Sequence, residues 1–507
     1  MKKYNGLTIL AMVILLVSSC TDEFLDKQPF AVTSSDAFFT SEQDALLAVN
    51  AAYEELKRFK HGGRNDVNAY DATGLMWSGN VHEHPDLVST FGIVRTFTIQ
   101  PTDNLANHNW WRGYVGIQRC NQVIQNVSEI ENIDSGVRDR IIGEAYFLRG
   151  LYYHYLTMWY GGVPIVDRLL DPGQEEDFVI PRSTKEEILA LVKSDLEKAE
   201  SMLPTSYSGD DVGRATRGAA KALLLKVLLW QKDYPAALAK AQEIEGMGYS
   251  LVDEYTSLFD GSNENSSESV FEIQFAAVTG ENTGSSLSLI YGPNGEGMVP
   301  NGGWGFVRPL PDLVNEYEEG DSRKSATVFE IGDTFTKNNG SVITFEDRVN
   351  GTGFGTRKYV TDPPSGTTVG INYAPQNFHE IRYAEVILLY AEALLRNGQK
   401  DAAVEQINRV RARPSVDLPL LDPGTLTDQQ AWEALYHEYR VELALEARFG
   451  YALRRWGIAS EWYASKAGID SPLTEFENFK SGKDEVLPIP QRQIDFSDGT
   501  LDQNPGY

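Results

Sequence analysis

The hydrophobic pattern of the chain is most regular between Ile381 and Pro414, where two apolar segments flank a short polar turn. From Ile381 to Leu395 nearly every uncharged position is apolar or Ala, and no Gly or Pro interrupts the run. This pattern predicts a helix that is buried on most of its circumference. Gly398 supplies a left-handed end for that helix, and a second helix is expected from Asp401 to Pro414. Two helices in about 34 residues have the period of a tetratricopeptide-type repeat, whose hairpins need neighbours to bury their faces.

Three more helical hairpins are predicted from apolar periodicity elsewhere in the chain. Thr184 followed by Glu187 has the pattern of a capping box, and Thr216 is the expected N-cap of another helix. Insertions separate the hairpins, so they do not form a strict tandem array. The four predicted hairpins are Ser35–Leu56 with Trp110–Val127, Arg138–Trp159 with Thr184–Leu203, Thr216–Trp230 with Ala236–Ile244, and Ile381–Leu395 with Asp401–Pro414.

Two long stretches lack a helical period. Asp66–Gln100 mixes Gly, Asn, His and Asp with β-branched residues, and we expect it to form loops with short strands. Ser250–Pro375 is rich in Gly, Asn, Ser, Thr and Pro, and the alternation over Ser269–Phe275 predicts a strand. Because a connection of this length is uncommon in a compact domain, we expect a functional elaboration. Beyond the last hairpin, Asp428–Trp456 predicts one long helix.

The first twenty residues have the pattern of a secretory signal. Lys2 and Lys3 precede an apolar run, Leu7–Val17, that is too short to span a bilayer. The small residues before Cys20 then resemble a lipobox, in which the cysteine is lipidated and becomes the mature N-terminus. An ordinary signal peptide with a chance cysteine is the alternative. Cys120 would be the only other thiol, so we expect no intrachain disulfide and interpret it as a small core residue.

The expected fold is therefore mainly α, with four tetratricopeptide-like helical hairpins as a scaffold and a large loop-rich elaboration that carries short strands. The expected segments are a lipoprotein signal peptide at 1–19, a lipid-anchored tether at 20–35, an N-terminal helical region at 36–249, and a C-terminal region at 250–507 with the loop-rich insertion and the fourth hairpin. The net charge of −27 over 507 residues disfavours nucleic acid and anionic lipid surfaces as partners, because both would repel the chain.

Charged residues recur on the predicted helices, near opposite charges at helical spacing and among apolar neighbours. An acid–base catalyst would instead need two carboxylates that face a substrate cleft. We therefore expect ion pairs that buttress the helix stack. The residues concerned are Glu385, Glu392, Glu438, Arg440, Glu442, Glu446 and Arg448.

Candidate metal and catalytic motifs are few. The segment His82–Asp86 has two histidines at i and i+2 that could bind Zn²⁺ from a strand, but no further ligands support such a site, and we expect a solvated loop. The oxygen-rich run at 260–265 lacks EF-hand spacing, and Gly351–Gly355 lacks the strand and helix of a phosphate cradle. No G-x-S-x-G motif occurs. We predict a protein without enzyme activity, metal site or cofactor.

Aromatic residues fall into two classes. Those in helical repeats are expected in the core: Trp110, Trp111, Trp159, Trp230, Trp432 and Trp456. Those in Gly- and Asn-rich loops have less opportunity for burial, so exposure would need a reason. Their flat rings could stack on sugar rings while amides bond hydroxyl groups; the alternative is that the rings pin their loops to the scaffold. The candidate ligand-binding residues are Trp77, Asn80, Tyr291, Asn301, Trp304 and Phe306.

Several separate stretches resemble one family, the SusD/RagB-like outer-membrane nutrient-binding lipoproteins. They occur in the family's order and cover almost the whole chain. A departure is His437-Glu438-Tyr439-Arg440, where the family usually has a denser Glu/Arg cluster. The matching stretches are Cys20 with Phe24-Leu25-Asp26, Glu144–Arg149 with Tyr160–Pro164, Gly213–Ala220, Val270–Phe275, Arg382–Ala393, Ile407–Arg413, Glu438–Glu446 with Arg454–Gly457, Leu487–Gln491 and Asn504–Tyr507.

The resemblance implies a glycan- or oligosaccharide-binding lipoprotein at the outer membrane, lipid-anchored through Cys20 and facing the cell exterior. Its partner would be a SusC-like TonB-dependent transporter, which it covers as a lid. In this family the helices form the scaffold and the ligand lies on loops outside it. Two alternatives stay open: a helical-repeat scaffold that binds peptides or proteins in its groove, and a secreted glycan-degrading enzyme.

Overall fold

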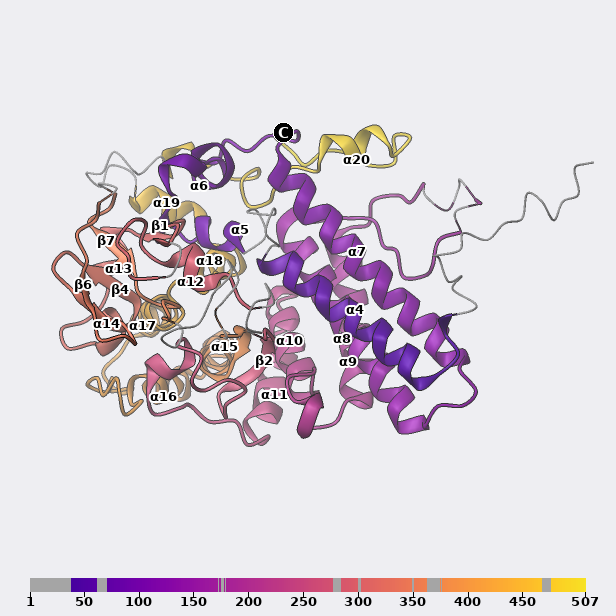
Figure 1. Cartoon of the computed structure of the whole chain (residues 1–507), viewed down its shortest axis with the longest axis horizontal. Helices are drawn as coiled ribbons and strands as arrows, with labels where there is room; N and C mark the ends of the chain where they lie inside the picture. The colour runs from indigo at the N-terminus through magenta and orange to yellow at the C-terminus, as the bar shows by residue number, and fades with distance from the viewer. Residues whose placement is uncertain are drawn as a thin grey trace, which may run out of the picture.

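A row of helices forms the scaffold, and each helix contacts the next one along the row (Figure 1). The computed structural model describes residues 38–61, 71–171, 173–174, 177, 179–276, 284–299, 302–348, 351–362, 374, 376–466 and 476–507. In order, the row contains α4 (Glu42–His61), α7 (Asn104–Asn126), α8 (Ser135–Tyr160), α9 (Lys185–Met202), α10 (Arg217–Trp230), α11 (Tyr234–Glu245), α15 (Tyr383–Arg396), α16 (Lys400–Arg411) and α17 (Asp428–Glu442).

This row confirms the mainly α fold and the pairing in all four predicted hairpins: α4 with α7, α8 with α9, α10 with α11, and α15 with α16. The predicted caps are also confirmed. Thr184 and Glu187 form a capping box, and the Thr216 hydroxyl accepts the Ala219 N–H at 3.1 Å. Gly398 has a left-handed φ of 72° after α15. The first hairpin differs in its bounds, because α4 begins at Glu42 and α7 begins at Asn104.

The loop-rich half lies beside the α15–α17 end of the row (Figure 1). Its strands are short and form two-stranded antiparallel sheets: β2 with β8, β4 with β7, β5 with β6, and β3 with β1 (Val81–His82) from an earlier segment. The strand predicted over Ser269–Phe275 is present as β2, which ends two residues earlier, at Ile273. The elements are η6 (Tyr255–Leu258), β2 (Ser269–Ile273), α12 (Leu287–Tyr291), β3 (Arg308–Pro309), α13 (Pro311–Val314), α14 (Ser322–Thr327), β4 (Val328–Glu330), β5 (Thr334–Thr336), β6 (Val342–Thr344), β7 (Phe354–Thr356) and β8 (Phe378–Arg382).

The segment Asp66–Gln100 contains more helix than its composition predicts. Its described part places α5, η1, η2 and α6 around the single short strand β1, which pairs with β3 of the loop-rich half. The bounds are α5 (Ala72–Met76), β1 (Val81–His82), η1 (Pro85–Leu87), η2 (Val88–Gly92) and α6 (Ile93–Arg95).

The other elements in the described part of the chain are η3 (Val127–Glu129), η5 (Gly209–Asp211), α18 (Phe449–Trp456), α19 (Ala459–Lys466), η8 (Phe476–Asn478) and α20 (Gln491–Asp495).

The prediction of one helix over Asp428–Trp456 is wrong, because the chain turns between α17 and α18. Leu445 and Ala447 have left-handed φ values of 64° and 62°. Side chains from distant segments bond the carbonyl groups that the turn leaves free. Glu442 O accepts from Arg382 Nη2 at 2.6 Å, Ala444 O accepts from Lys358 Nζ at 2.8 Å, and Leu445 O accepts from the Tyr291 hydroxyl at 3.3 Å.

A buried ion network joins this turn to the loop-rich half. Arg382 donates to Glu268 at 2.9 Å, to Glu442 at 2.6 Å and to Glu446 at 2.8 Å. All of these side chains are almost fully buried, so the predicted ion-pair role of the helical charges is confirmed. We use the name "buried ion network" for Glu268, Asp321, Arg323, Lys358, Arg382, Arg413, Glu438, Glu442 and Glu446.

Most of the aromatic residues expected in the core are there. Trp110, Trp159 and Trp456 are buried, and Trp230 and Trp432 pack against the core while partly exposed. Trp111 is an error of the prediction: half of its surface is exposed on α7, where its ring lies 4.4 Å from the Arg112 guanidinium. Cys120 is fully buried in α7, as expected for a small core residue.

Replacing Thr216 with Ala should lower the free energy of unfolding by about 1 kcal/mol, because the Ala219 N–H loses its capping acceptor. Chemical denaturation would measure the change. Thr205→Ala, which removes an exposed threonine outside any helix, is the matched control and should change little. A loss of ligand affinity in Thr216→Ala at unchanged stability would show that Thr216 belongs to a binding site.

Replacing Glu446 with Gln should destabilise the protein by about 3–5 kcal/mol at neutral pH, because Arg382 and Lys358 lose a buried counter-charge. Burial alone would raise the pKa of Glu446, but the nearby charges of Arg382 and Lys358 lower that pKa to about 2. The ion pairs of Glu446 therefore stabilise the fold above pH 4.5, and that contribution is lost as the pH falls from 4.5 towards 2.

Thermal unfolding between pH 2 and pH 8 tests this expectation. The melting temperature of Glu446→Gln should fall less steeply below pH 4.5 than that of the unmodified protein. Glu461→Gln, at an exposed position on α19, is the matched control and should keep the original profile. Parallel profiles for all three proteins would contradict the role of Glu446.

Candidate functional site

Trp304 and Phe306 lie on a glycine-rich loop that follows α12. Gly302, Gly303 and Gly305 have left-handed φ values of 93°, 62° and 58°. Residues that carry a Cβ rarely adopt this backbone conformation. Between these turns, the Trp304 N–H donates to Leu289 O at 2.7 Å and the Phe306 N–H donates to Ile290 O at 2.9 Å. The backbone bonds to α12 therefore fix the positions from which both rings project.

The two rings form a pair. Their centroids are 5.0 Å apart with an angle of 34° between the planes, and Phe306 also contacts Phe91 edge-on at 6.3 Å. Both side chains are partly buried, so each ring retains some exposed surface. We call Trp304 and Phe306 the aromatic pair. These are the two sequence-predicted ligand-binding residues that the structure brings together at the surface.

Three other predicted ligand-binding residues lie in the interior, which corrects the expectation that loop composition implies exposure. The Trp77 ring is 1% exposed and lies 3.6 Å from the Arg454 guanidinium. Asn80 Oδ1 accepts Arg440 Nε at 2.8 Å, and the Tyr291 hydroxyl donates to Leu445 O. These three side chains hold segments of the fold together. Asn301 lies outside the described residues.

The segment His82–Asp86 is not the solvated loop that its polarity predicts. His82, Glu83 and His84 are all buried, and Glu83 Oε2 accepts Arg95 Nε at 2.8 Å. Burial lowers the pKa of both histidines. Among the described residues, no group of three or more His, Cys, Asp or Glu side chains is arranged to hold a metal ion. The segment therefore has a structural role at the β1–β3 junction.

The other two candidate motifs form turns. Asp347 accepts the N–H groups of Gly351 and Gly353, each at 2.9 Å, and this loop leads into β7. The interpretation of Gly351–Gly355 as a turn holds for residues 351–353, whereas Phe354 and Gly355 belong to β7. Asp260 accepts the Ser262 N–H at 2.8 Å, which closes a local turn at the start of the 260–265 run.

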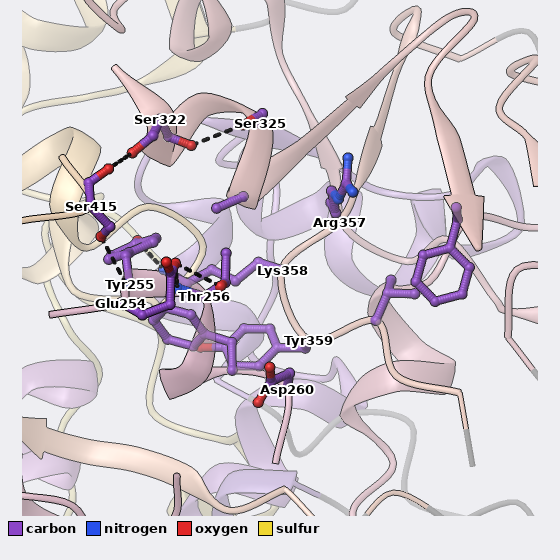
Figure 2. Close-up of a pocket in the computed structure, with 14 residues that line it drawn as sticks. Glu254, Tyr255, Thr256, Asp260, Ser322, Ser325, Arg357, Lys358, Tyr359 and Ser415 are labelled. Carbon is purple, nitrogen blue, oxygen red and sulfur yellow. Dashed lines mark hydrogen bonds between the residues drawn. The ribbon is translucent and has the colours of Figure 1, made fainter. Parts of the chain in front are cut away.

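A cavity of about 460 Å³ lies in the loop-rich half, and the sequence did not predict it (Figure 2). Its volume is within the roughly 300–1,000 Å³ that is usual for small-molecule sites. We call it the polar pocket. Its lining residues come from η6 and the residues that flank it, from α14 and β5, and from the segments after β7 and α16: Glu254, Tyr255, Thr256, Phe259, Asp260, Ser322, Ser325, Ala326, Phe335, Arg357, Lys358, Tyr359, Val360 and Ser415.

The base of the polar pocket is held by the buried ion network. Lys358 Nζ donates to Glu446 Oε1 at 2.6 Å, to Ala444 O at 2.8 Å and to the Tyr255 hydroxyl at 3.0 Å. Burial lowers the pKa of Lys358 to about 8 although Glu446 favours the charged form. All three ammonium protons have acceptors, so Lys358 acts as a structural cation beneath the pocket.

The scaffold of helical repeats, with the aromatic pair and the polar pocket in its loop-rich half, is typical of a repeat-based binding protein. No helix in the described part of the chain has the length and apolar character needed to cross a membrane. The predicted signal peptide and Cys20 lie outside the described residues. The four segment bounds predicted from the sequence stay a prediction.

Comparison with known proteins identifies the family. The model of the SusD family matches residues 267–507, and a model described as starch-binding associating with outer membrane matches residues 23–229. The chain therefore belongs to the SusD/RagB-like family. Its relatives include SusD-like protein P25 of Formosa agariphila, 27% identical over 90% of each chain. The starch-binding protein SusD of Bacteroides thetaiotaomicron is 24% identical over 72% of each chain.

Solved structures share the fold over nearly the full length. A laminarin binding SusD-like protein is 27% identical, with a TM-score of 0.76, covering 92% of this chain and 100% of the other. A SusD-like protein from Bacteroides fragilis is 24% identical, with a TM-score of 0.79, covering 95% of this chain and 100% of the other. These similarities agree with the mainly α architecture described above.

Proposed function

We propose that this protein is a surface glycan-binding lipoprotein that captures an oligosaccharide at the outer membrane and delivers it to a SusC-like TonB-dependent transporter. The observation that carries the proposal is the match of SusD-type family models to both halves of the chain. The relatives named for laminarin and starch bind glucose polymers, which supports a glycan as the ligand.

The aromatic pair is the proposed contact surface for the glycan. Sugar rings present flat C–H faces, and partly exposed aromatic rings offer a complementary apolar face. The backbone bonds of Trp304 and Phe306 to α12 orient the pair before ligand arrives, so binding orders little additional chain. Trp77, Asn80 and Tyr291 are omitted from this surface because their side chains lie in the interior.

Lipidation of Cys20 would place the protein on the outer membrane, and we propose that it faces the cell exterior. The short apolar run before Cys20 supports this location, as does the family description of proteins that associate with the outer membrane. A glycan held on the loop-rich half would then be released to a transporter beneath the protein.

Catalysis is not part of the proposed function. A glycan array that is probed with the soluble form starting after Cys20 would identify the bound sugar, and product analysis of the same glycans would detect hydrolysis. Binding without product supports a binding protein. Release of shorter sugars that is lost in Glu254→Gln or Asp260→Asn, at the two carboxylates of the polar pocket, would show an enzyme instead.

Trp304→Ala should weaken glycan binding by about tenfold or more, because a stacking interaction of about 0.5–1.5 kcal/mol is lost together with burial of the ring face. Isothermal titration with the glycan from the array would measure the affinity. The melting temperature should fall only slightly, since the ring is partly exposed.

Trp111→Ala is the matched control for this experiment, because Trp111 is the half-exposed tryptophan of α7, on the helical row. Its replacement should leave affinity unchanged. If Trp304→Ala instead lowers the melting temperature strongly and the folded fraction keeps full affinity, Trp304 pins its loop and the glycan binds elsewhere.

Cys20→Ala should release the protein from the membrane fraction, because the thiol that carries the lipid is absent. Cell fractionation followed by detection of the protein would show the change. Cys120→Ala removes the buried thiol and is the control; it should fractionate like the unmodified protein. Unchanged fractionation of Cys20→Ala would contradict lipid anchoring.

A further inference from the structure

We infer that the polar pocket is a second carbohydrate subsite, which binds a neutral sugar unit separately from the aromatic pair. The inference rests on the proposed function, because it assigns another part of the protein to the same class of ligand. It is carried by the composition of the pocket walls, by the polar atoms that they leave available, and by the rigidity of the pocket base.

The walls offer the hydrogen-bonding groups that a sugar needs. The Arg357 guanidinium forms no hydrogen bond or ion pair within the described part of the chain; it lies 5.0 Å from the centre of the Phe329 ring. Its fork of N–H groups could donate to two neighbouring sugar oxygens. Glu254 and Asp260 supply carboxylate oxygens that accept sugar hydroxyl protons, and each also bonds its own loop through one oxygen.

Hydroxyl groups cover much of the remaining wall. Ser325 Oγ donates to Ser322 O at 3.0 Å, Ser322 Oγ donates to Ser415 O, and Ser415 Oγ accepts the Tyr255 N–H at 3.0 Å (Figure 2). The serine oxygens retain lone pairs for ligand donors. Phe335, which is partly exposed on β5, adds an aromatic ring to the lining.

The charge balance selects a neutral ligand. Two carboxylates, Glu254 and Asp260, and two cations, Arg357 and Lys358, line the pocket, so their formal charges cancel and neither an anionic nor a cationic sugar gains a net attraction. A polyhydroxylated neutral molecule can satisfy Glu254, Asp260 and Arg357, because each hydroxyl can both donate and accept.

The pocket is also preorganised. The bonds of Lys358 to Glu446 and Tyr255 fix the base of the pocket, and the backbone N–H of Arg357 donates to Thr327 O at 2.8 Å. Tyr359 packs between Phe259, at 5.5 Å, and Tyr291, at 5.0 Å, measured between ring centroids. A ligand would therefore bind without reordering the loops, and this lowers the entropic cost of binding a small ligand.

Ligand-observed saturation-transfer NMR tests the subsite with methyl glycosides of glucose, galactose and mannose as probes. The unmodified protein should give signals from at least one glycoside, and Trp304→Ala should retain them. Arg357→Ala should weaken that binding at least tenfold, and Ser325→Trp, which fills the mouth of the pocket from α14, should do the same. Arg492→Ala is the matched control. Like Arg357, Arg492 lies over an aromatic ring, that of Phe496 at 5.6 Å, but it is outside the pocket.

Each result separates the subsite from the aromatic pair. Loss of the glycoside signals in Trp304→Ala, with retention in Arg357→Ala and Ser325→Trp, would overturn the subsite while leaving surface glycan binding intact. Absence of signals from all three glycosides would also overturn it. Signals from glycylglycine alone, lost in Arg357→Ala, would reassign the pocket to peptides. Pocket-dependent glycoside signals in a protein that binds nothing on the glycan array would support the subsite and contradict the proposed capture of a longer glycan.

Discussion

Arg382 and the buried carboxylates around it constrain the whole loop-rich half. Removing a guanidinium from water is costly, and the cost is recovered only when charged partners satisfy it in good geometry. Arg382 finds those partners in Glu268, before β2, and in Glu442 and Glu446, at the end of α17 and in the turn after it. The segment before β2, the end of β8 and the turn after α17 must therefore assemble together.

This constraint determines how the helical row meets the loops. The turn between α17 and α18 exists because Arg382, Lys358 and Tyr291 provide donors for its carbonyl groups. Lys358 then holds the base of the polar pocket, while Tyr291 ends α12, whose carbonyl groups bind the loop of Trp304. One set of buried charges thus positions both candidate ligand surfaces, although neither surface contains an exposed member of that set.

The parts of the fold that could be predicted from sequence are those with local causes. Periodic apolar faces and caps such as Thr216 and Gly398 act within one or two turns, so the hairpins and their partners were predictable. The prediction of one long helix over Asp428–Trp456 failed because the break depends on donors sixty or more residues away in sequence. The polar pocket was missed for a similar reason, since five separate segments line it.

Composition also fails to separate an aromatic residue that binds from one that supports a loop. Trp77 and Trp304 both follow Gly- or Asn-rich sequence, yet the Trp77 ring is covered by the Arg454 guanidinium and by the edge of the Tyr451 ring. The Tyr451 hydroxyl in turn donates to Asp71. Trp304 differs in its backbone: left-handed glycines on both sides turn the chain, and the N–H bonds to α12 are made by the loop itself. The loop is therefore held without complete burial of the ring. A ring that is not needed to close the core can keep an exposed face, and such a face is the physical requirement for stacking on a sugar.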